Sequence, residues 1–264
     1  MKISSTATVD VEYQQDVVVI RLNRPDALNA FNGTLIAELV DVLRQTRFDE
    51  SRAIVLTGSG RAFSAGGDHK FLAERHATEQ SGAADGVRPA VNDLIPALAD
   101  VAKPVIAAVN GVAVGLGATL ALNCDYILLS SEARIGDRHV RIGLVPGIDA
   151  AIWTALLGPL KAKEILMSAT MLTPDEALKL GLVNDVVEPD DLLPRALAYA
   201  QRLAEFPPYA VQASKAAVNL HVQSITDRIA PAALAWEQLS MLTDDHREAL
   251  TAHSEKRPGR YTGR

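Results

Sequence analysis

Cysteine is almost absent from this sequence of 264 residues. The single thiol, Cys124, excludes an intramolecular disulfide and a zinc site built from several cysteines. Proteins of oxidising compartments usually carry disulfides, so a lone cysteine is typical of a reducing compartment. We therefore expect a cytoplasmic protein, while a mature protein of an organelle matrix would show the same pattern.

Long apolar runs and an excess of basic residues are also missing. No segment approaches the roughly 20 apolar residues that span a bilayer, and residues 1–10 are too polar for a secretory signal. The formal net charge is −6, which argues against general attraction to nucleic acid or to an anionic membrane. With 48% hydrophobic and 22% charged residues, the chain has the composition of a globular protein with a substantial core.

What the sequence does contain is an alternation of strand and helix signals. Short β-branched runs predict buried strands at residues 17–22, 53–57, 105–109, 126–129 and 182–187. Helical spacing of apolar residues predicts a helix over 35–47 with Asn32 as N-cap, and small residues predict another over 115–123. Thr173 begins a capping box that predicts a third helix. The alternation from about residue 15 to 190 indicates an α/β fold.

The end of this alternation predicts the domain organisation. Strand signals stop after residue 191, Pro207-Pro208 is a natural break, and the segments beyond it are helical and richer in charge. We therefore expect a core over residues 1–200 and a helical C-terminal region over residues 201–264.

Two glycine-rich loops are the first sign of a ligand site. They are 62–68 (AFSAGGD) and 110–117 (NGVAVGLG), and each follows a predicted strand and precedes a helical segment. Glycine lets the backbone approach a ligand closely, and a helix N-terminus offers unpaired N–H donors. Such turns also serve tight packing, so both interpretations stay open at this point. The sequence has no dinucleotide fingerprint, no Walker-A loop and no Gly-x-Ser-x-Gly elbow.

Several motifs around these loops resemble those of the crotonase (enoyl-CoA hydratase/isomerase) superfamily. They follow in order along nearly the whole chain: LNRP (22–25), ALNA (27–30), FSAGGD (63–68), KPVIAAVNG (103–111), CD (124–125), GLVPG (143–147), ALKLGLV (177–183) and EKRP (255–258). The resemblance implies a crotonase-like spiral of ββα turns and a C-terminal α-helical trimerisation region, often in a dimer of trimers. It also implies an acyl-CoA thioester as ligand, with no cofactor beyond the coenzyme A moiety.

The resemblance further implies an oxyanion hole made of two peptide N–H groups. On this sequence the two donors belong to Gly67, just before Asp68, and to Leu116, between Gly115 and Gly117. Enolisation or conjugate addition places negative charge on the thioester oxygen, and two fixed donors stabilise that charge more than the neutral ground state.

Contacts with the coenzyme A moiety are expected at a second set of residues. The resemblance places Ala65 against the adenine ring, and it places the basic side chains of Lys70 and Lys256 near the phosphates. Asp68 and His69 adjoin the first loop, and we include them among the binding residues. An exposed lysine can equally be a solvated side chain, and His69 can equally point to solvent.

Two positions depart from the family pattern. Hydratases of the family use two glutamates to handle the water and its proton, and here Thr119 and His139 take their places. A threonine hydroxyl is not a base at neutral pH without an activating group, although it can position a water or a substrate hydroxyl. Ordinary hydration by two glutamates is therefore not expected, and the isomerase interpretation is weakened as well.

His139 becomes the candidate for proton transfer. An imidazole titrates near ~6.5 and can give or take a proton at neutral pH. In an extended segment Asp137 would lie on the same side and orient the ring, and Asp149 is a second candidate partner. Alternatively, His139 fills space or bonds a main-chain carbonyl, and Asp149 caps a helix that starts near Ala150.

We expect no metal site, and we expect the other histidines of the tail at the surface: His221, His246 and His253.

The sequence therefore leads to three hypotheses. The first is an acyl-CoA enzyme of the hydratase/isomerase type. The second is another reaction at the same enolate: thioester hydrolysis, C–C bond cleavage or decarboxylation. The third is an acyl-CoA-binding relative without catalysis. The ionisable side chains at 137–149 argue mildly against the third, since a decayed site more often fills with apolar residues.

Overall fold

The computed structural model describes residues 3–68 and 88–264. The chain forms two compact units, Met1–Ile135 with Leu172–Asn219 and Gly136–Met171 with Leu220–Arg264. Strands and helices alternate through the first unit, which confirms the predicted α/β fold. The division at residue 200 rests on composition alone and stays a prediction.

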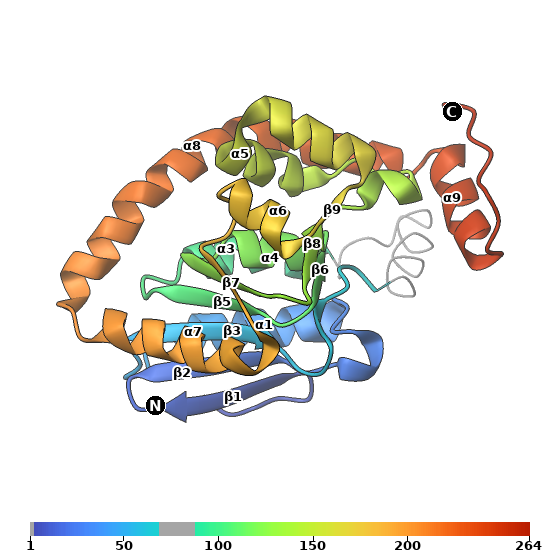
Figure 1. The fold of residues 1–264 in the computed structure, drawn as a ribbon. Helices are drawn as coiled ribbons and strands as arrows, with labels where there is room; N and C mark the ends of the chain where they lie inside the picture. Colours follow the sequence, from blue (N-terminus) through green and yellow to red (C-terminus); the bar gives the residue numbers. More distant parts are fainter. Residues whose placement is uncertain (1–2, 69–87) are drawn as a thin grey trace. The chain divides into compact units, whose positions relative to one another are not determined.

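A six-stranded sheet forms the base of the first unit (Figure 1). Its order is β1-β2-β3-β5-β7-β10, with β1 antiparallel to β2 and the other neighbours parallel. The strands are β1 (Val9–Gln14), β2 (Val17–Leu22), β3 (Ala53–Gly58), β5 (Val105–Val109), β7 (Tyr126–Ser130) and β10 (Asp185–Val187). The apolar runs of the sequence thus became parallel strands buried on both faces.

Helix α7 (Pro189–Ala204) covers one face of this sheet (Figure 1). Leu192, Ala196 and Ala200 recur every fourth residue, so they lie on one side of the helix. They pack into one buried cluster with side chains of the central strands, among them Val55 and Ile106. The small alanines let the helix approach the sheet closely.

Further helices of this unit are α1 (Gly33–Gln45), α3 (Arg88–Ala99), α4 (Leu116–Leu122) and α6 (Pro174–Lys179). Two of them, α1 and α6, begin where their predicted caps place them. Oδ1 of Asn32 accepts the N–H of Leu35 at 2.9 Å, and Thr173 forms the predicted capping box with Glu176. The strand predicted over 182–187 is shorter, because only the residues of β10 pair with β7.

A second, four-stranded sheet carries the glycine-rich loops. Its order is β4-β6-β8-β9, and its strands are β4 (Ala62–Ser64), β6 (Val112–Val114), β8 (Arg134–Gly136) and β9 (Met171–Leu172). Each strand has only two or three residues, too few for an alternating pattern in the sequence. β8 and β9 lie where the chain leaves and re-enters the first unit.

The second unit is helical. It contains the 3-10 helix η2 (His139–Ile142), α5 (Gly147–Ser168), α9 (Asp244–Ser254) and the later part of α8 (Pro208–Ser240). Helix α5 is kinked at Gly158, whose φ is 74°.

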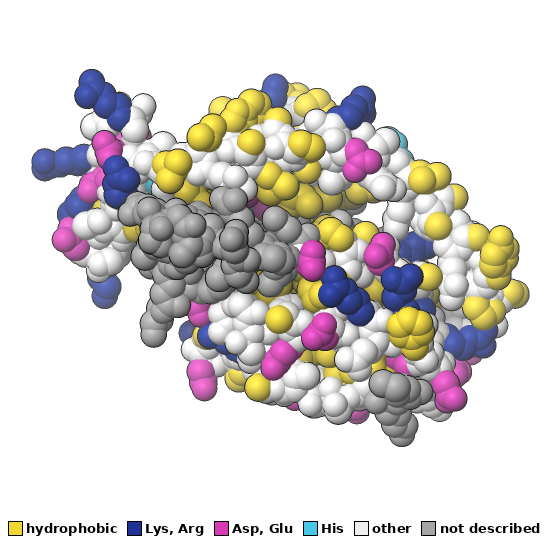
Figure 2. Space-filling view, turned by 180° about the vertical axis from the view of Figure 1, so that it is seen from behind, with side chains coloured by type: hydrophobic (Ala, Val, Ile, Leu, Met, Phe, Trp, Pro, Cys, Tyr) yellow, Lys and Arg dark blue, Asp and Glu magenta, His cyan; other side chains and the backbone are white. Residues whose placement is uncertain are grey.

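None of the helices in the described part of the chain is long and apolar enough to cross a membrane. On the face in Figure 2, basic and acidic side chains are interspersed.

His246 was expected at the surface, and that expectation is wrong. The residue is 2% exposed, because its backbone packs against Gly143, where an added Cβ would lie 2.9 Å from the Cα of His246. The imidazole Nδ1 contacts the carbonyl oxygen of Ile142 in η2. His221 and His253 are exposed, as predicted.

Candidate active site

The first glycine-rich loop is held against the segment around Phe31. The Phe31 N–H donates to the carbonyl of Gly66 at 2.7 Å, and the Asp68 N–H donates to the carbonyl of Phe31 at 3.0 Å. These bonds form an isolated parallel bridge between Phe31 and Gly67. In a parallel ladder the flanking peptides make the bonds, so the N–H of Gly67 itself is directed away from Phe31.

Asn29 of the ALNA motif supports the same loop. Its Nδ2 donates to the carbonyls of Ser59 at 2.9 Å and Ala62 at 2.8 Å, and Ser64 Oγ donates to the carbonyl of Asn29 at 2.8 Å. Asn29 is fully buried and has a φ of 54°, a left-handed conformation that asparagine tolerates better than most residues. The motif therefore positions the loop from its buried side.

The second loop places Leu116 at the first position of α4. Gly115 is the N-cap, with a φ of 51°, and its carbonyl accepts the N–H of Thr119 at 2.8 Å. The N–H of Leu116 therefore belongs to the first turn, whose donors have no acceptor within the helix. Gly67 and Leu116 are both partly exposed.

Close packing brings the two loops together. Strand β4 pairs with β6, and a Cβ built on Gly117 would lie 2.7 Å from the carbonyl oxygen of Ser64. Glycine at 117 therefore permits contact between the second loop and the first. The structure thus places both predicted oxyanion loops side by side in the first unit.

Thr119 is fully buried. Its Oγ1 donates to the carbonyl of Gly115 at 3.0 Å, a common bond of a threonine to the preceding turn of its helix. With its proton in that bond, the hydroxyl can take part in any further hydrogen bond only as an acceptor.

The residues predicted to bind coenzyme A lie in different settings. Ala65 is partly exposed, and its N–H donates to the carbonyl of Leu28 at 2.9 Å. Asp68 forms an ion pair with Arg24 of the LNRP motif at 3.0 Å. Lys256 is exposed in the second unit. His69 and Lys70 lie outside the described residues.

His139 and Asp137 form a hydrogen-bonded pair in the second unit. The imidazole Nδ1 lies 2.5 Å from Oδ2 of Asp137, and the His139 N–H donates to Oδ1 of the same carboxylate at 3.0 Å. The pairing was expected from an extended segment, whereas His139 in fact begins η2. Asp137 is fully buried and the side chain of His139 is 19% exposed, so the carboxylate orients a ring that remains accessible.

The surroundings of His139 favour its cationic form. Burial alone lowers the pKa of an imidazole. The charge and hydrogen bond of Asp137 and the charges of Asp149 and Glu237 outweigh that effect and raise the pKa of His139 to about 9. The ring is therefore protonated at neutral pH and can donate a proton from Nε2.

Asp149 does not cap α5, in contrast to the alternative considered from the sequence. The helix begins at Gly147 after Pro146, so Asp149 lies in its first turn and is 4% exposed. One donor atom each from Asp149, Asp137 and His139 lie within 4.8 Å of one another. This spacing is compatible with a metal ion, which the sequence did not suggest, but the Asp137–His139 hydrogen bond already explains the pairing of those two side chains.

Glu237 of α8 is the charged neighbour of His139 that the sequence did not reveal. It belongs to no recognisable motif, and it lies far from His139 along the chain. No local pattern could have connected the two residues.

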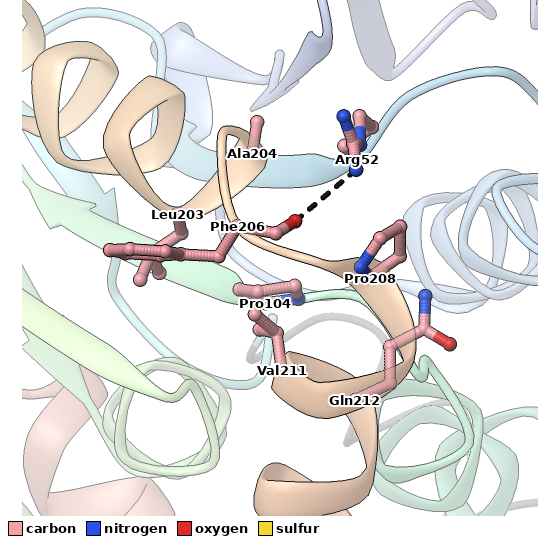
Figure 3. Close-up of a pocket in the computed structure, with 8 residues that line it drawn as sticks. All are labelled: Arg52, Pro104, Leu203, Ala204, Phe206, Pro208, Val211 and Gln212. Atoms are coloured by element: carbon pink, nitrogen blue, oxygen red, sulfur yellow. Dashed lines mark hydrogen bonds between the residues drawn. The ribbon is translucent and has the colours of Figure 1, made fainter.

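A separate pocket lies between the end of α7 and the start of α8 (Figure 3). Its lining includes Pro104, Leu203 and Val211, and Nη2 of Arg52 donates to the carbonyl of Phe206 at 3.2 Å. None of the predicted catalytic residues lines this pocket, so we do not assign the chemistry to it.

Known proteins resemble this chain over nearly its whole length. A family model described as enoyl-CoA hydratase/isomerase matches residues 12–264. A crotonyl-CoA hydratase of Syntrophomonas wolfei is 36% identical, covering 95% of this chain and 96% of that protein. A short-chain-enoyl-CoA hydratase of Clostridium acetobutylicum is 38% identical, covering 94% of this chain and 95% of that protein. A 1,2-epoxyphenylacetyl-CoA isomerase of Escherichia coli is 32% identical, covering 95% of this chain and 97% of that protein.

Solved structures show the same fold. An enoyl-CoA hydratase/isomerase from Pseudoalteromonas atlantica superposes with a TM-score of 0.87 at 27% identity, covering 97% of this chain and 100% of that one. One from Mycobacterium paratuberculosis superposes with a TM-score of 0.86 at 35% identity, covering 94% and 99%.

Proposed function

The chain belongs to the enoyl-CoA hydratase/isomerase family, and on that premise we propose that it converts an acyl-CoA thioester through an enolate held by Gly67 and Leu116. The observation that carries the proposal is the packing of the two glycine-rich loops, with the Gly67 N–H directed away from Phe31 and the Leu116 N–H in the first turn of α4. Two fixed donors of this kind stabilise an oxyanion, and loss of one typically costs roughly 2.7–4 kcal/mol of barrier.

His139 transfers the proton in this proposal. Asp137 holds Nδ1, which leaves Nε2 for the substrate, and Asp149 adds a second negative charge. Thr119 positions a water or a substrate hydroxyl through its acceptor lone pairs. The coenzyme A moiety contacts Ala65, Asp68, His69, Lys70 and Lys256 and serves as part of the substrate, so the reaction uses no further cofactor.

Assembly into a homotrimer, or into a dimer of trimers, is part of the same proposal. Large apolar side chains are exposed along α8, among them Val218, Leu220, Trp236 and Leu239. A contact with other copies would remove this apolar surface from water. Light scattering coupled to size exclusion will measure the mass, and a monomer at micromolar concentration would contradict the assembly.

A second candidate reaction is thioester hydrolysis, C–C cleavage or decarboxylation at the same enolate. It is favoured by the side chains at 119 and 139, which offer a hydroxyl bonded to the main chain and a cationic imidazole in place of two carboxylates. Decarboxylation in particular needs no strong base, because carbon dioxide leaves with the formation of the enolate.

Crotonyl-CoA is the first substrate to test, because relatives carry the names crotonyl-CoA hydratase and short-chain-enoyl-CoA hydratase. Loss of the enoyl absorbance will be followed for wild type, His139→Ala and His139→Glu. A matched control is His221→Ala, which changes an exposed histidine of α8. We expect His139→Ala to lose about 10²–10⁴-fold in kcat and the control to match wild type.

The other outcomes separate the hypotheses. An unchanged rate for His139→Ala on the substrate that is turned over would exclude the role of His139. Tight CoA-ester binding without wild-type hydration would direct the search to hydrolysis, C–C cleavage or decarboxylation, read by product mass. Binding with no turnover of any thioester would indicate a relative without catalysis.

A further inference from the structure

The carboxylate of Glu237 lies over the first residue of α5. A Cβ built on Gly147 would come within 2.1 Å of Oε2 of Glu237, so only glycine leaves room for the carboxylate at this place. Gly147 has no left-handed backbone that would require glycine by itself. The absent side chain therefore serves the approach of Glu237.

The same turn of α8 is fixed to the chain just before α5. Ser240 Oγ accepts the N–H of Val145 at 3.1 Å and donates to the carbonyl of Glu237 at 2.6 Å. Two side chains three residues apart lie on one face of a helix. Ser240 thus anchors the face of α8 that presents Glu237 to the segment 145–147.

Two carboxylates lie at one imidazole in the second unit, and a third acts on it through its charge. Asp137 bonds Nδ1 directly, Asp149 lies within the same donor cluster, and Glu237 acts on the ring through its charge. Other ionisable groups on the segments packed against η2 include Arg138 and Arg141, near His139 in the sequence, and Asp245 and His246 of α9. Asp137, Asp149 and Glu237 are all negative, so their charges favour the protonated, cationic form of the ring.

We propose that Glu237 is a positioning residue of the His139 site, the third carboxylate that holds the imidazole as a proton donor at the start of the reaction. This inference rests on the proposed function and specifies the direction of proton transfer, from His139 to the substrate. The Nε2–H bond breaks and leaves its electron pair on the nitrogen, the electron pair of the enolate forms the new C–H bond, and the ring becomes neutral. Solvent then returns the proton to the ring.

The electrostatics agree with this direction. Burial opposes the charged ring, and the two aspartates and Glu237 together raise the pKa of His139 to about 9. A histidine in a neutral polar setting would be mostly unprotonated at pH 7.5. Removing one of three charges will lower the pKa without removing the hydrogen bond of Asp137.

Two variants remove Glu237 in independent ways. Glu237→Gln keeps the shape and removes the charge, while Gly147→Ala keeps the charge and displaces the flexible carboxylate with a methyl group. The control is Asp227→Asn, which removes a negative charge from an exposed site on α8, roughly 15 Å along the helix at 1.5 Å per residue. NMR of protein labelled in its histidines will titrate the His139 ring in each full-length variant.

We expect both variants to lower the His139 pKa by about 0.5–1 unit and to move the alkaline limb of the pH–rate profile down with it, and we expect Asp227→Asn to leave both in place. An unchanged titration in both variants would overturn the proposal. A stoichiometric metal ion in the purified protein would overturn it as well, because a metal would then be the cation at the ring. The titration requires no turnover, so it separates failure of this inference from failure of the proposed function.

Discussion

Gly66 lies directly against the carbonyl oxygen of Val114. A Cβ at this position would come within 2.7 Å of that oxygen, and the φ of Gly66 is 87°. The glycine is therefore required twice, once by its backbone and once by its neighbour. Through this contact the first glycine-rich loop keeps its place beside the second.

Gly66→Ala tests that contact. A left-handed alanine costs about 1–2 kcal/mol, and the clash with a main-chain oxygen adds to it, so we expect a total loss of about 2–4 kcal/mol in urea unfolding. Turnover of the substrate should fall with the displaced loop. Gly181→Ala is the control, because its φ of 70° carries the same strain with nothing within 4 Å of the added methyl. Equal losses from both variants would contradict the role of packing.

Arg24→Met tests whether the LNRP motif positions the first loop. Arg24 pairs with Asp68 and also contacts the carbonyl of Ala30, and both side chains of the pair are about a fifth exposed. We expect kcat/KM to fall by roughly 10–100-fold, since small displacements of binding groups are costly in catalysis. Arg21→Met removes a more exposed pair with Glu12 and should leave kcat/KM unchanged. A similar loss in both variants would indicate a general effect of arginine removal.

Lys215→Met tests the ion pair that fixes the start of α8. Nζ of Lys215 lies 2.7 Å from Oδ2 of Asp125, and the two side chains are 10% and 23% exposed. Because Asp125 would keep the N–H of Val105 but lose its cationic partner, we expect a loss of about 2–4 kcal/mol in urea unfolding. The double variant with Asp125→Asn should recover part of that loss, since it leaves no uncompensated charge. Additive losses in the double variant would show that the two side chains do not interact.

The His139 pair predicts a dependence of stability on pH. A histidine whose pKa is raised on folding stabilises the folded state fully below its unfolded value of about 6.5, and this contribution is lost as pH rises through the folded value. With a folded pKa of about 9, the window is pH 6.5 to 9. We expect the free energy of unfolding to lose on the order of 3 kcal/mol across it. His139→Gln should flatten the curve over that window, and a parallel curve would contradict the assignment.

Local signals predicted the framework of the first unit. The runs at 17–22 and 105–109 became β2 and β5 at the predicted residues, and Asn32 and Thr173 cap the helices they were expected to cap. These features depend on a few consecutive residues, so the sequence alone specifies them. The short strands β4 and β6 were not predicted, because their pairing comes from the contact between the two loops.

The sequence predicted the two loops, the pair of Asp137 with His139 and the family, because each depends on residues that are close together in the chain. The surroundings of His139 were not predicted. Apart from Asp149, which the sequence offered as a candidate partner, they include Glu237 and the buried His246, which lie far from His139 along the chain and reach this region only through helix packing. Residue type and spacing along the chain thus determined which chemistry is present, whereas tertiary packing decided the charge on the imidazole, because electrostatic effects depend on distance in space.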